Sequence, residues 1–109
     1  GGVLGLGEPM HRDVPIPVDL LPVYTKSGGV GPEGWSECFA TVAETVAVCR
    51  EVGFAILEAD NAPDAWRWWD EFSTNDPYCR ADPDGEASII QQDAGRWLTY
   101  GYIVARKPD

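Results

Sequence analysis

The sequence is poor in the residues that mark several large classes of protein. Lys and Arg account for only 8 of its 109 residues, against 18 Asp and Glu, and the formal charge is −10. Nucleic-acid phosphates require Lys and Arg on the binding face, so a nucleic-acid partner is not expected. No uninterrupted apolar run is long enough to span a bilayer, so no membrane span is expected either.

Cysteine is scarce as well. Cys38, Cys49 and Cys79 are an odd number without paired spacing, which favours free thiols in a reducing compartment. No basic, apolar leader precedes the domain, so we expect a cytoplasmic protein. None of the three thiols has a histidine nearby in sequence, and the acidic stretch 82–86 lacks the spacing of a calcium loop. No metal site is therefore expected.

A complete nucleotide-binding loop is missing too. Gly5-Leu6-Gly7 has neither the third glycine nor the helix that such a loop needs. We interpret Gly1–Glu8 as a strand that ends in a turn, diluted by glycine but able to serve as a buried central strand. Because no Met and no cap precede it, the chain is expected to start inside a fold.

The strongest positive signal is the stretch Thr41–Asp60. Thr41 and Glu44 form a capping box at the start of an apolar stripe with helical spacing. Gly53 suits the end of that helix, and Phe54–Leu57 follows as an apolar run of strand length. A helix that leads directly into such a strand is the second half of a βαβ unit.

The segment Pro9–Ser36 is predicted to be a long irregular loop, because three prolines interrupt it and the stretch before Trp35 is rich in glycine. One or two helical turns are expected within Val18–Tyr24. A loop this long in a compact domain is usually functional or disordered. Its large side chains favour a lid over a substrate pocket, and a self-packed surface loop is the alternative.

The second half of the chain predicts two helices and a strand. A helix is expected over Pro63–Phe72, capped by Asn61, with its aromatic face in the core or an interface rather than under a cofactor. An acidic, turn-rich connection and a short helix over Ala87–Asp93 follow. The closing segment Arg96–Lys107 is a strand that can pair antiparallel with the strand after Gly53.

This order of elements resembles the C-terminal half of a class I S-adenosylmethionine-dependent methyltransferase, of the small-molecule type found in ubiquinone and menaquinone biosynthesis. GGVLGLGEP is similar to the fifth strand of that family, and the capped helix ending in Gly-Phe leads to the sixth. GYIVARKP is similar to the final antiparallel strand, which lies between those two. The likeness covers essentially the whole chain.

The resemblance implies an α/β fold that is part of a Rossmann-like methyltransferase: the last three strands, the final one antiparallel, with flanking helices. Residues 1–109 then form a single partial domain, and residues 9–36 form a lid on the substrate side. The family's cofactor loop and the acidic residue that holds the ribose are absent, so no cofactor-binding residue is expected here. S-adenosylmethionine would bind only in the complete enzyme, and this chain alone should be inactive.

Two kinds of function therefore remain open. The first is the substrate-side portion of a methyltransferase, acting on a small-molecule acceptor and completed along an exposed sheet edge at Val3–Leu6 by a missing N-terminal half or a second copy. The alternative is a stand-alone, non-catalytic α+β module that binds a partner or dimerises through its Trp-bearing helix.

The candidate catalytic residues follow the first strand, because α/β folds place ligands beyond the carboxyl ends of their strands. His11, the only histidine, can act as a general base near neutral pH. Glu8 is the second candidate, although it could equally hold the loop by accepting backbone N–H bonds. Packing alone would also explain the candidate substrate-binding residues, which are Met10, Leu21, Tyr24, Trp35 and Trp66.

Overall fold

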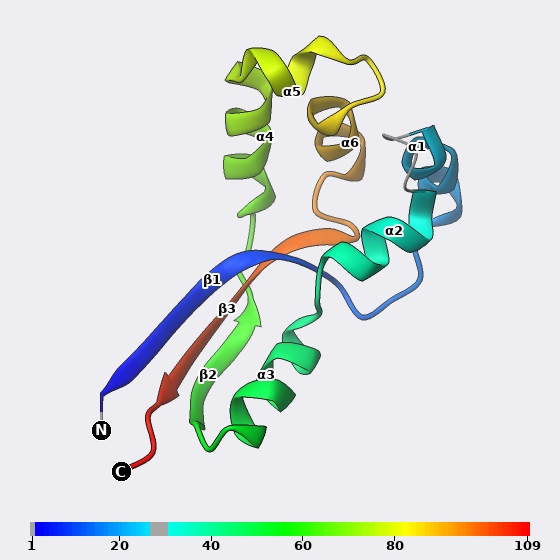
Figure 1. The fold of residues 1–109 in the computed structure, drawn as a ribbon. Helices are drawn as coiled ribbons and strands as arrows, with labels where there is room; N and C mark the ends of the chain where they lie inside the picture. Colours follow the sequence, from blue (N-terminus) through cyan, green and yellow to red (C-terminus); the bar gives the residue numbers. More distant parts are fainter. Residues whose placement is uncertain (1, 27–30) are drawn as a thin grey trace.

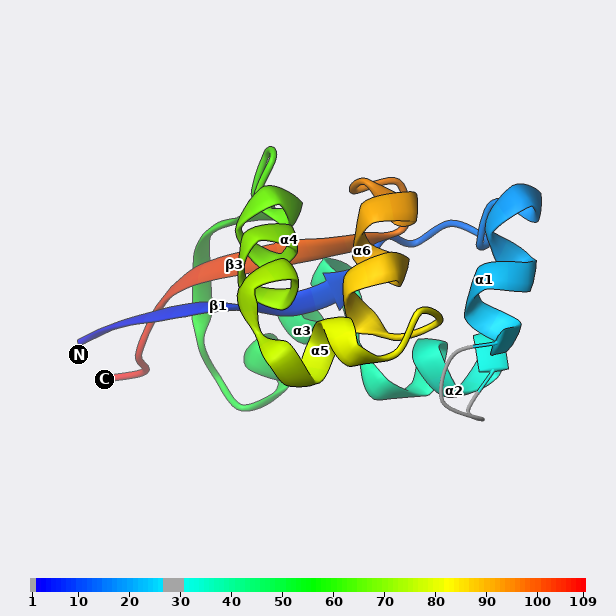
Figure 2. The same ribbon diagram turned by 90° about the horizontal axis from the view of Figure 1, so that it is seen from above.

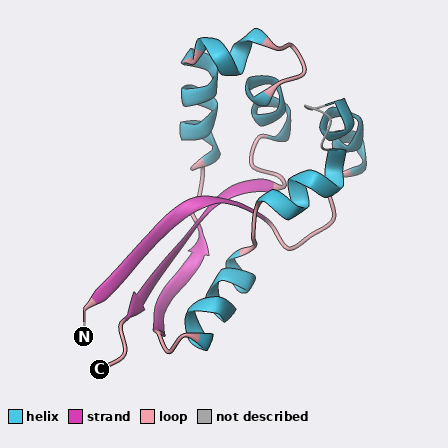
Figure 3. Cartoon of the chain, in the orientation of Figure 1, coloured by secondary structure: helices cyan, strands magenta, loops and turns pink. Residues whose placement is uncertain are grey.

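The computed structural model describes residues 2–26 and 31–109, which form a three-stranded sheet, one helix packed on it and a helical cap at one end (Figures 1 and 3). The elements in chain order are β1 (Val3–His11), the 3-10 turn η1 (Val18–Leu20), α1 (Leu21–Lys26), α2 (Gly31–Cys38), α3 (Val42–Glu51), β2 (Ala55–Asn61), α4 (Trp66–Asn75), α5 (Pro77–Ala81), α6 (Glu86–Asp93) and β3 (Leu98–Arg106).

The sheet has the strand order β1-β3-β2, and β3 runs antiparallel to both neighbours. Since β1 and β2 each oppose β3, they are parallel to each other, and their carboxyl ends lie at the same end of the sheet. The predicted α/β fold class is therefore confirmed, with the last strand antiparallel between the first two. The antiparallel pairing of the closing strand with the strand after Gly53 is confirmed as well.

Within the described chain, β1 is an edge strand, so its interpretation as a buried central strand is wrong for this sheet. Val3 is 62% exposed and Leu4 37%, which confirms the expected open edge. The strand also runs past Glu8 to His11. It passes through Pro9 because a residue without an N–H is tolerated at a sheet edge, where one row of amides has no partner.

Helix α3 begins and ends as its sequence predicts. The Thr41 hydroxyl accepts a hydrogen bond from the Glu44 amide at 3.1 Å, and the Glu44 carboxylate accepts from that hydroxyl rather than from the Thr41 amide. Gly53 has a φ of +99°, the left-handed conformation expected after a helix. Cys49 is buried between α3 and the sheet, in a small core with Ile103 and Ala105.

The cap is built from two insertions, one after each parallel strand. The insertion after β1 forms η1, α1 and α2, and the insertion after β2 forms α4, α5 and α6 (Figures 1 and 2). One aromatic-rich core joins them to the start of β3; its buried members are Leu20, Tyr24, Trp69, Ile89, Ile90, Trp97 and Leu98. Both chain termini lie at the opposite end of the sheet (Figure 1).

The prediction of an irregular Pro9–Ser36 loop is wrong over most of its length. The helical turns expected near Val18–Tyr24 are present, but residues 31–38 form helix α2 instead of a flexible glycine stretch. Residues 27–30 lie outside the described residues. Pro32 occupies the first turn of α2, where its missing amide costs nothing. Trp35, half-buried against the ring of Tyr24, supplies packing that outweighs the weak local propensity.

Helix α4 starts later than predicted. Asn61 ends β2 rather than capping the helix, and Asp64 has a φ of +56°, which prevents a helix from running through Pro63. The helix buries Trp69 as expected. Trp68 is 68% exposed and Phe72 62%, so the aromatic face lies only partly in the core. The short helix predicted near 87–93 is confirmed as α6, and α5 lies inside the segment interpreted as turns.

None of the helices in the described ranges combines the length and apolar character needed to cross a membrane.

Gly101 of β3 closely faces the side chains of Met10 on β1 and Val42 on α3. A Cβ at Gly101 would collide with the Sδ atom of Met10 and lie 2.8 Å from Cγ2 of Val42. Gly101→Ala should therefore lower the free energy of unfolding by about 1–3 kcal/mol through overpacking, measured by urea denaturation.

Gly5→Ala is the matched control, because a Cβ at Gly5 on the open edge meets no atom within 4 Å. Its effect should stay within about 0.5 kcal/mol. Equal stabilities for the two variants would contradict the close approach at Gly101.

Candidate functional site

The candidate site lies where the carboxyl end of β1 meets the start of α3. An open hollow of about 610 Å³ occupies this position, bounded by the end of β1, one side of α3 and the strand β2. Its lining residues are His11–Asp13, Thr41–Ala43, Val46, Arg50, Ile56–Ala59 and Asn61. A hollow of this size falls in the range of small-molecule sites.

Two contacts hold the ring of His11, one on its face and one at its edge. The imidazole is half-buried and stacks on the Trp97 indole, with ring centroids 4.7 Å apart and an interplanar angle of 18°. Its Nδ1 lies 2.8 Å from the carbonyl oxygen of Arg12. A carbonyl oxygen can only accept, so Nδ1 carries the proton and the neutral ring has its basic lone pair on Nε2. That arrangement is suited to a general base.

Glu8 does not join His11 in the structure. Side chains alternate along a strand, so Glu8 shares a face with Met10 while His11 lies on the other face, in register with Leu98. Glu8 is exposed. The two candidate catalytic residues are therefore placed at the same end of β1 but do not form a pair.

The candidate substrate-binding residues are spread over four places. Met10 is fully buried between the sheet and α3, and Tyr24 is fully buried in the cap core. Trp35 meets the edge of the Tyr24 ring at a centroid distance of 5.5 Å. Leu21 is 39% exposed at the start of α1, and Trp66 is half-buried against Gly95. Only Tyr24 and Trp35 are brought together, and substrate contact remains a prediction for all five.

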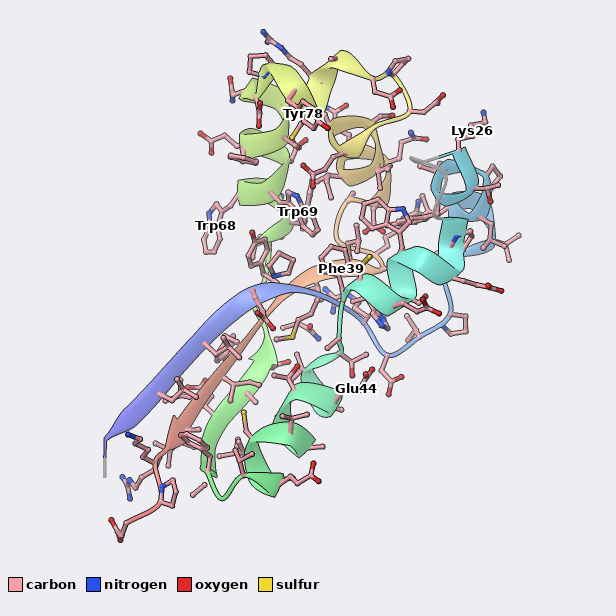
Figure 4. The ribbon with its side chains drawn as sticks, in the orientation of Figure 1. Lys26, Phe39, Glu44, Trp68, Trp69 and Tyr78 are labelled. Carbon is pink, nitrogen blue, oxygen red and sulfur yellow. The ribbon has the colours of Figure 1, made fainter. Side chains whose placement is uncertain are left out.

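Aromatic side chains connect the two insertions of the cap. Phe39, after α2, meets Trp69 of α4 edge to face at 5.8 Å, and Trp69 meets Tyr100 of β3 in the same way. In Figure 4, Trp69 points into the cap toward Phe39, whereas Trp68 points away from it. The Trp-bearing helix thus buries Trp69 in the core and leaves Trp68 and Phe72 on the surface.

Sequence reasoning missed two residues that shape this region, Trp97 and Asp93. Trp97 is 1% exposed and supplies the surface on which His11 stacks. Asp93 is a buried carboxylate that accepts a hydrogen bond of 2.6 Å from the Tyr24 hydroxyl. Burial, followed by this hydrogen bond, raises the pKa of Tyr24 far above its usual value, so the phenol stays protonated and donates. No local motif distinguishes either residue.

The described residues do not fit S-adenosylmethionine. Gly5 and Gly7 lie inside an extended strand, and no helix begins directly after it to face a charged ligand. The start of α3 is already occupied by its own Glu44 carboxylate. Nor does any group of three His, Cys, Asp or Glu side chains in the described part of the chain converge on a common point where a metal ion could bind.

No protein-family model matches the chain, and no curated protein is significantly similar to it in sequence. Among solved structures, YjhP from E. coli is similar over 100% of this chain, with a TM-score of 0.52 and 17% identity. An S-adenosylmethionine-dependent methyltransferase from Geobacter sulfurreducens, in complex with S-adenosyl-L-homocysteine, is similar over 99% of the chain, with a TM-score of 0.47 and 17% identity. The chain spans about half of each, 51% and 47%. The likeness to YjhP shows a shared fold.

Cys79 lies apart from the candidate site, in a second hollow beside the α5–α6 turn. Its thiol donates to the Glu86 carboxylate at 2.9 Å and to the Asp76 carboxylate at 3.5 Å. The hydrogen bond to Glu86, with partial burial and the charges of both carboxylates, raises the pKa of Cys79 to about 12. Since the thiolate is the nucleophile, this cysteine should be unreactive.

A second prediction concerns the rate at which Cys79 is alkylated at pH 9. Cys79 should be alkylated by iodoacetamide much more slowly than the exposed Cys38, because it holds its proton up to a higher pH. Glu86→Gln removes the main cause of the raised pKa, so more thiolate forms and alkylation should quicken by about tenfold or more, measured by peptide mass spectrometry. Glu71→Gln, which does not contact the thiol, is the control. Equal rates for both cysteines in the unmodified chain would contradict the hydrogen-bonded thiol.

Proposed function

We propose that this chain is the C-terminal, substrate-side portion of an S-adenosylmethionine-dependent methyltransferase that acts on a small molecule, of the ubiquinone- and menaquinone-biosynthesis type. The observation that carries the proposal is the strand order β1-β3-β2, with the last strand antiparallel between two parallel strands. The sequence resemblance implies this order for the fifth, seventh and sixth strands of that family.

The position of the cap supports a substrate-side role. Ligands of α/β folds bind beyond the carboxyl ends of the strands, and both insertions of this chain lie there. The segment 9–36 serves as a lid, as the sequence predicts, and its residues His11, Arg12 and Asp13 line the hollow at the end of β1. The insertion that carries α4, α5 and α6 packs against this segment through the cap core. The hollow at the end of β1 is large enough for a small acceptor.

The cofactor-binding half comes from a preceding segment or from a separate chain. It joins along the open edge of β1, where unpaired backbone groups and the exposed side chains of Val3 and Leu4 need a neighbouring strand. A second copy of this chain is the other candidate for that edge. The three free cysteines are in keeping with a cytoplasmic location, which is part of the proposal.

In the proposed reaction this chain positions the acceptor, excludes water and removes a proton from the acceptor. His11 is the first candidate for the base, since Nε2 carries the lone pair while Nδ1 is committed to the Arg12 carbonyl. Glu8, exposed on the other face of β1, is the second candidate. Neither residue has a role toward the cofactor.

A non-catalytic binding or dimerisation module is the second candidate function. Exposed aromatic side chains on α4 and α5 favour it: Trp68 is 68% exposed, Phe72 62% and Tyr78 88%. An apolar surface of this kind commonly marks an interaction site. It is compatible with the first proposal as well, because the cap of a complete protein can carry an interface.

Calorimetric titration with S-adenosylmethionine tests whether cofactor binding requires the half of the protein that this chain lacks. The 109-residue chain alone should release no binding heat, whereas the protein completed by its cofactor-binding half should bind one equivalent with a Kd in the micromolar range, as is typical for such ligands. Tight one-to-one binding by the chain alone would contradict the proposal that the cofactor-binding residues lie outside this chain. Lack of binding by the completed protein would contradict the methyltransferase proposal and favour the module.

His11→Ala tests the proposed base in the completed enzyme. Loss of a positioned base should lower kcat by about 10²- to 10⁴-fold, with the affinity for S-adenosylmethionine unchanged, in a steady-state methyl-transfer assay. Glu51→Gln, on the exposed side of α3, is the control and should keep full activity. Turnover within twofold of the unmodified enzyme, judged by the same assay, would remove His11 as the base and leave Glu8 to be tested.

A further inference from the structure

Asp93 is a charged side chain in a place where charge is costly. It is 1% exposed, and none of the described Lys or Arg side chains forms an ion pair with its carboxylate. Hydrogen bonds to the charged form offset the loss of water. Oδ2 accepts from the Tyr24 hydroxyl at 2.6 Å, Oδ1 accepts from the Trp97 amide at 3.0 Å, and the Leu98 amide lies 3.2 Å from both oxygens.

The carboxylate and its donors come from three parts of the fold. Tyr24 belongs to α1 in the first insertion, and Asp93 ends α6 in the second insertion. Trp97 directly precedes the central strand β3, and Leu98 begins it. Helices α1 and α6 lie side by side in the cap, in contact with each other (Figure 1). A single buried carboxylate therefore ties both insertions to the sheet.

Trp97 connects Asp93 and Tyr24 to His11. Its amide is held by Asp93, its indole Nε1–H donates to the carbonyl oxygen of Val14 at 3.0 Å, and the edge of the Tyr24 ring packs on it at 5.3 Å. Trp97 is thus held through its backbone amide, its indole N–H and one ring contact, and the imidazole of His11 stacks on its indole.

The second contact of the His11 ring depends on the same segment. The carbonyl that accepts from Nδ1 belongs to Arg12, whose amide donates to the Trp97 carbonyl at 2.8 Å and whose Nε donates to the Gly95 carbonyl at 2.9 Å. Both the plane of the imidazole and the partner of its Nδ1 are consequently set by residues 93–97.

We propose that Asp93 and Tyr24 are positioning residues for His11: they fix Trp97, and through Trp97 they hold the imidazole with Nδ1 protonated and Nε2 free to accept a proton. The purpose of this arrangement rests on the proposed function, in which His11 is the base. The arrangement itself is testable without turnover, because His11 is the only histidine and gives unique imidazole signals.

The experiment is nitrogen-detected NMR of the 109-residue chain at pH 8, where an ordinary imidazole is neutral. The unmodified chain should show a predominantly Nδ1–H tautomer and ring protons shifted upfield by the Trp97 indole. Tyr24→Phe removes one hydroxyl and keeps the ring, so it is the mildest disruption. It should shift the ring protons downfield and move the tautomer toward the Nε2–H form that exposed histidines prefer.

Asp19→Asn is the matched control. Asp19 also joins the first insertion to the segment before β3, through an exposed ion pair with Arg96 at 2.9 Å, but it does not contact Trp97. This variant should leave the His11 signals unchanged. The proposal is overturned if Tyr24→Phe leaves the tautomer and the ring-proton shifts as in the unmodified chain, or if Asp19→Asn changes them equally.

Activity of the completed enzyme gives the second readout. Tyr24→Phe should lower kcat by about tenfold to a hundredfold while KM for the acceptor stays within about twofold, since small displacements of a reacting group reduce rate more than binding. An altered tautomer together with an unchanged kcat would overturn the catalytic purpose of the positioning. Failure of the methyltransferase proposal is seen separately, as lack of S-adenosylmethionine binding, and leaves the NMR result to decide the geometry.

Discussion

The position of β3 between β1 and β2 in the sheet is the constraint on which the rest of the structure depends. The last strand of the chain pairs with both others, over Val3–His11 on one side and Ala55–Asn61 on the other. Because it opposes both, it brings their carboxyl ends to the same end of the sheet. The two insertions that leave those ends then have to meet, and their shared core forms the cap.

The two cores of the molecule differ in composition. The core under α3 is largely aliphatic: its buried members are Cys49, Ile103 and Ala105, and Gly101 lies close to the side chains of Met10 and Val42. The cap core contains large aromatic rings that contact one another in series from α2 through α4 to β3. The edge-to-face contacts in this series give the two insertions a fixed relative arrangement.

The elements predicted from the sequence are those that local signals define. Thr41 and Gly53 mark the two ends of α3 through their own side-chain and backbone chemistry, and the β-branched and aromatic closing segment is a strand as expected. The errors arise where packing decides. Helix α2 forms in a glycine-rich stretch because Trp35 and Phe39 have partners in the cap, and Asn61 ends a strand because that strand pairs with β3.

The candidate site was predictable only in part, for the same reason. His11 stood out as the single histidine after a strand, but nothing near it in sequence indicates its stacking partner Trp97. The hydrogen bond between Tyr24 and Asp93 joins residues 69 positions apart. Contacts of that range come from the topology, and no spacing rule in a single sequence reveals them.

The central proposal is that the sheet of this chain continues beyond β1 in a larger protein or assembly. Hydrogen exchange of the β1 amides that do not bond to β3 tests it most directly, by comparing the 109-residue chain with the completed protein. The account predicts fast exchange of these amides in the chain alone and strong protection in the completed protein. Equal exchange in the two would contradict it.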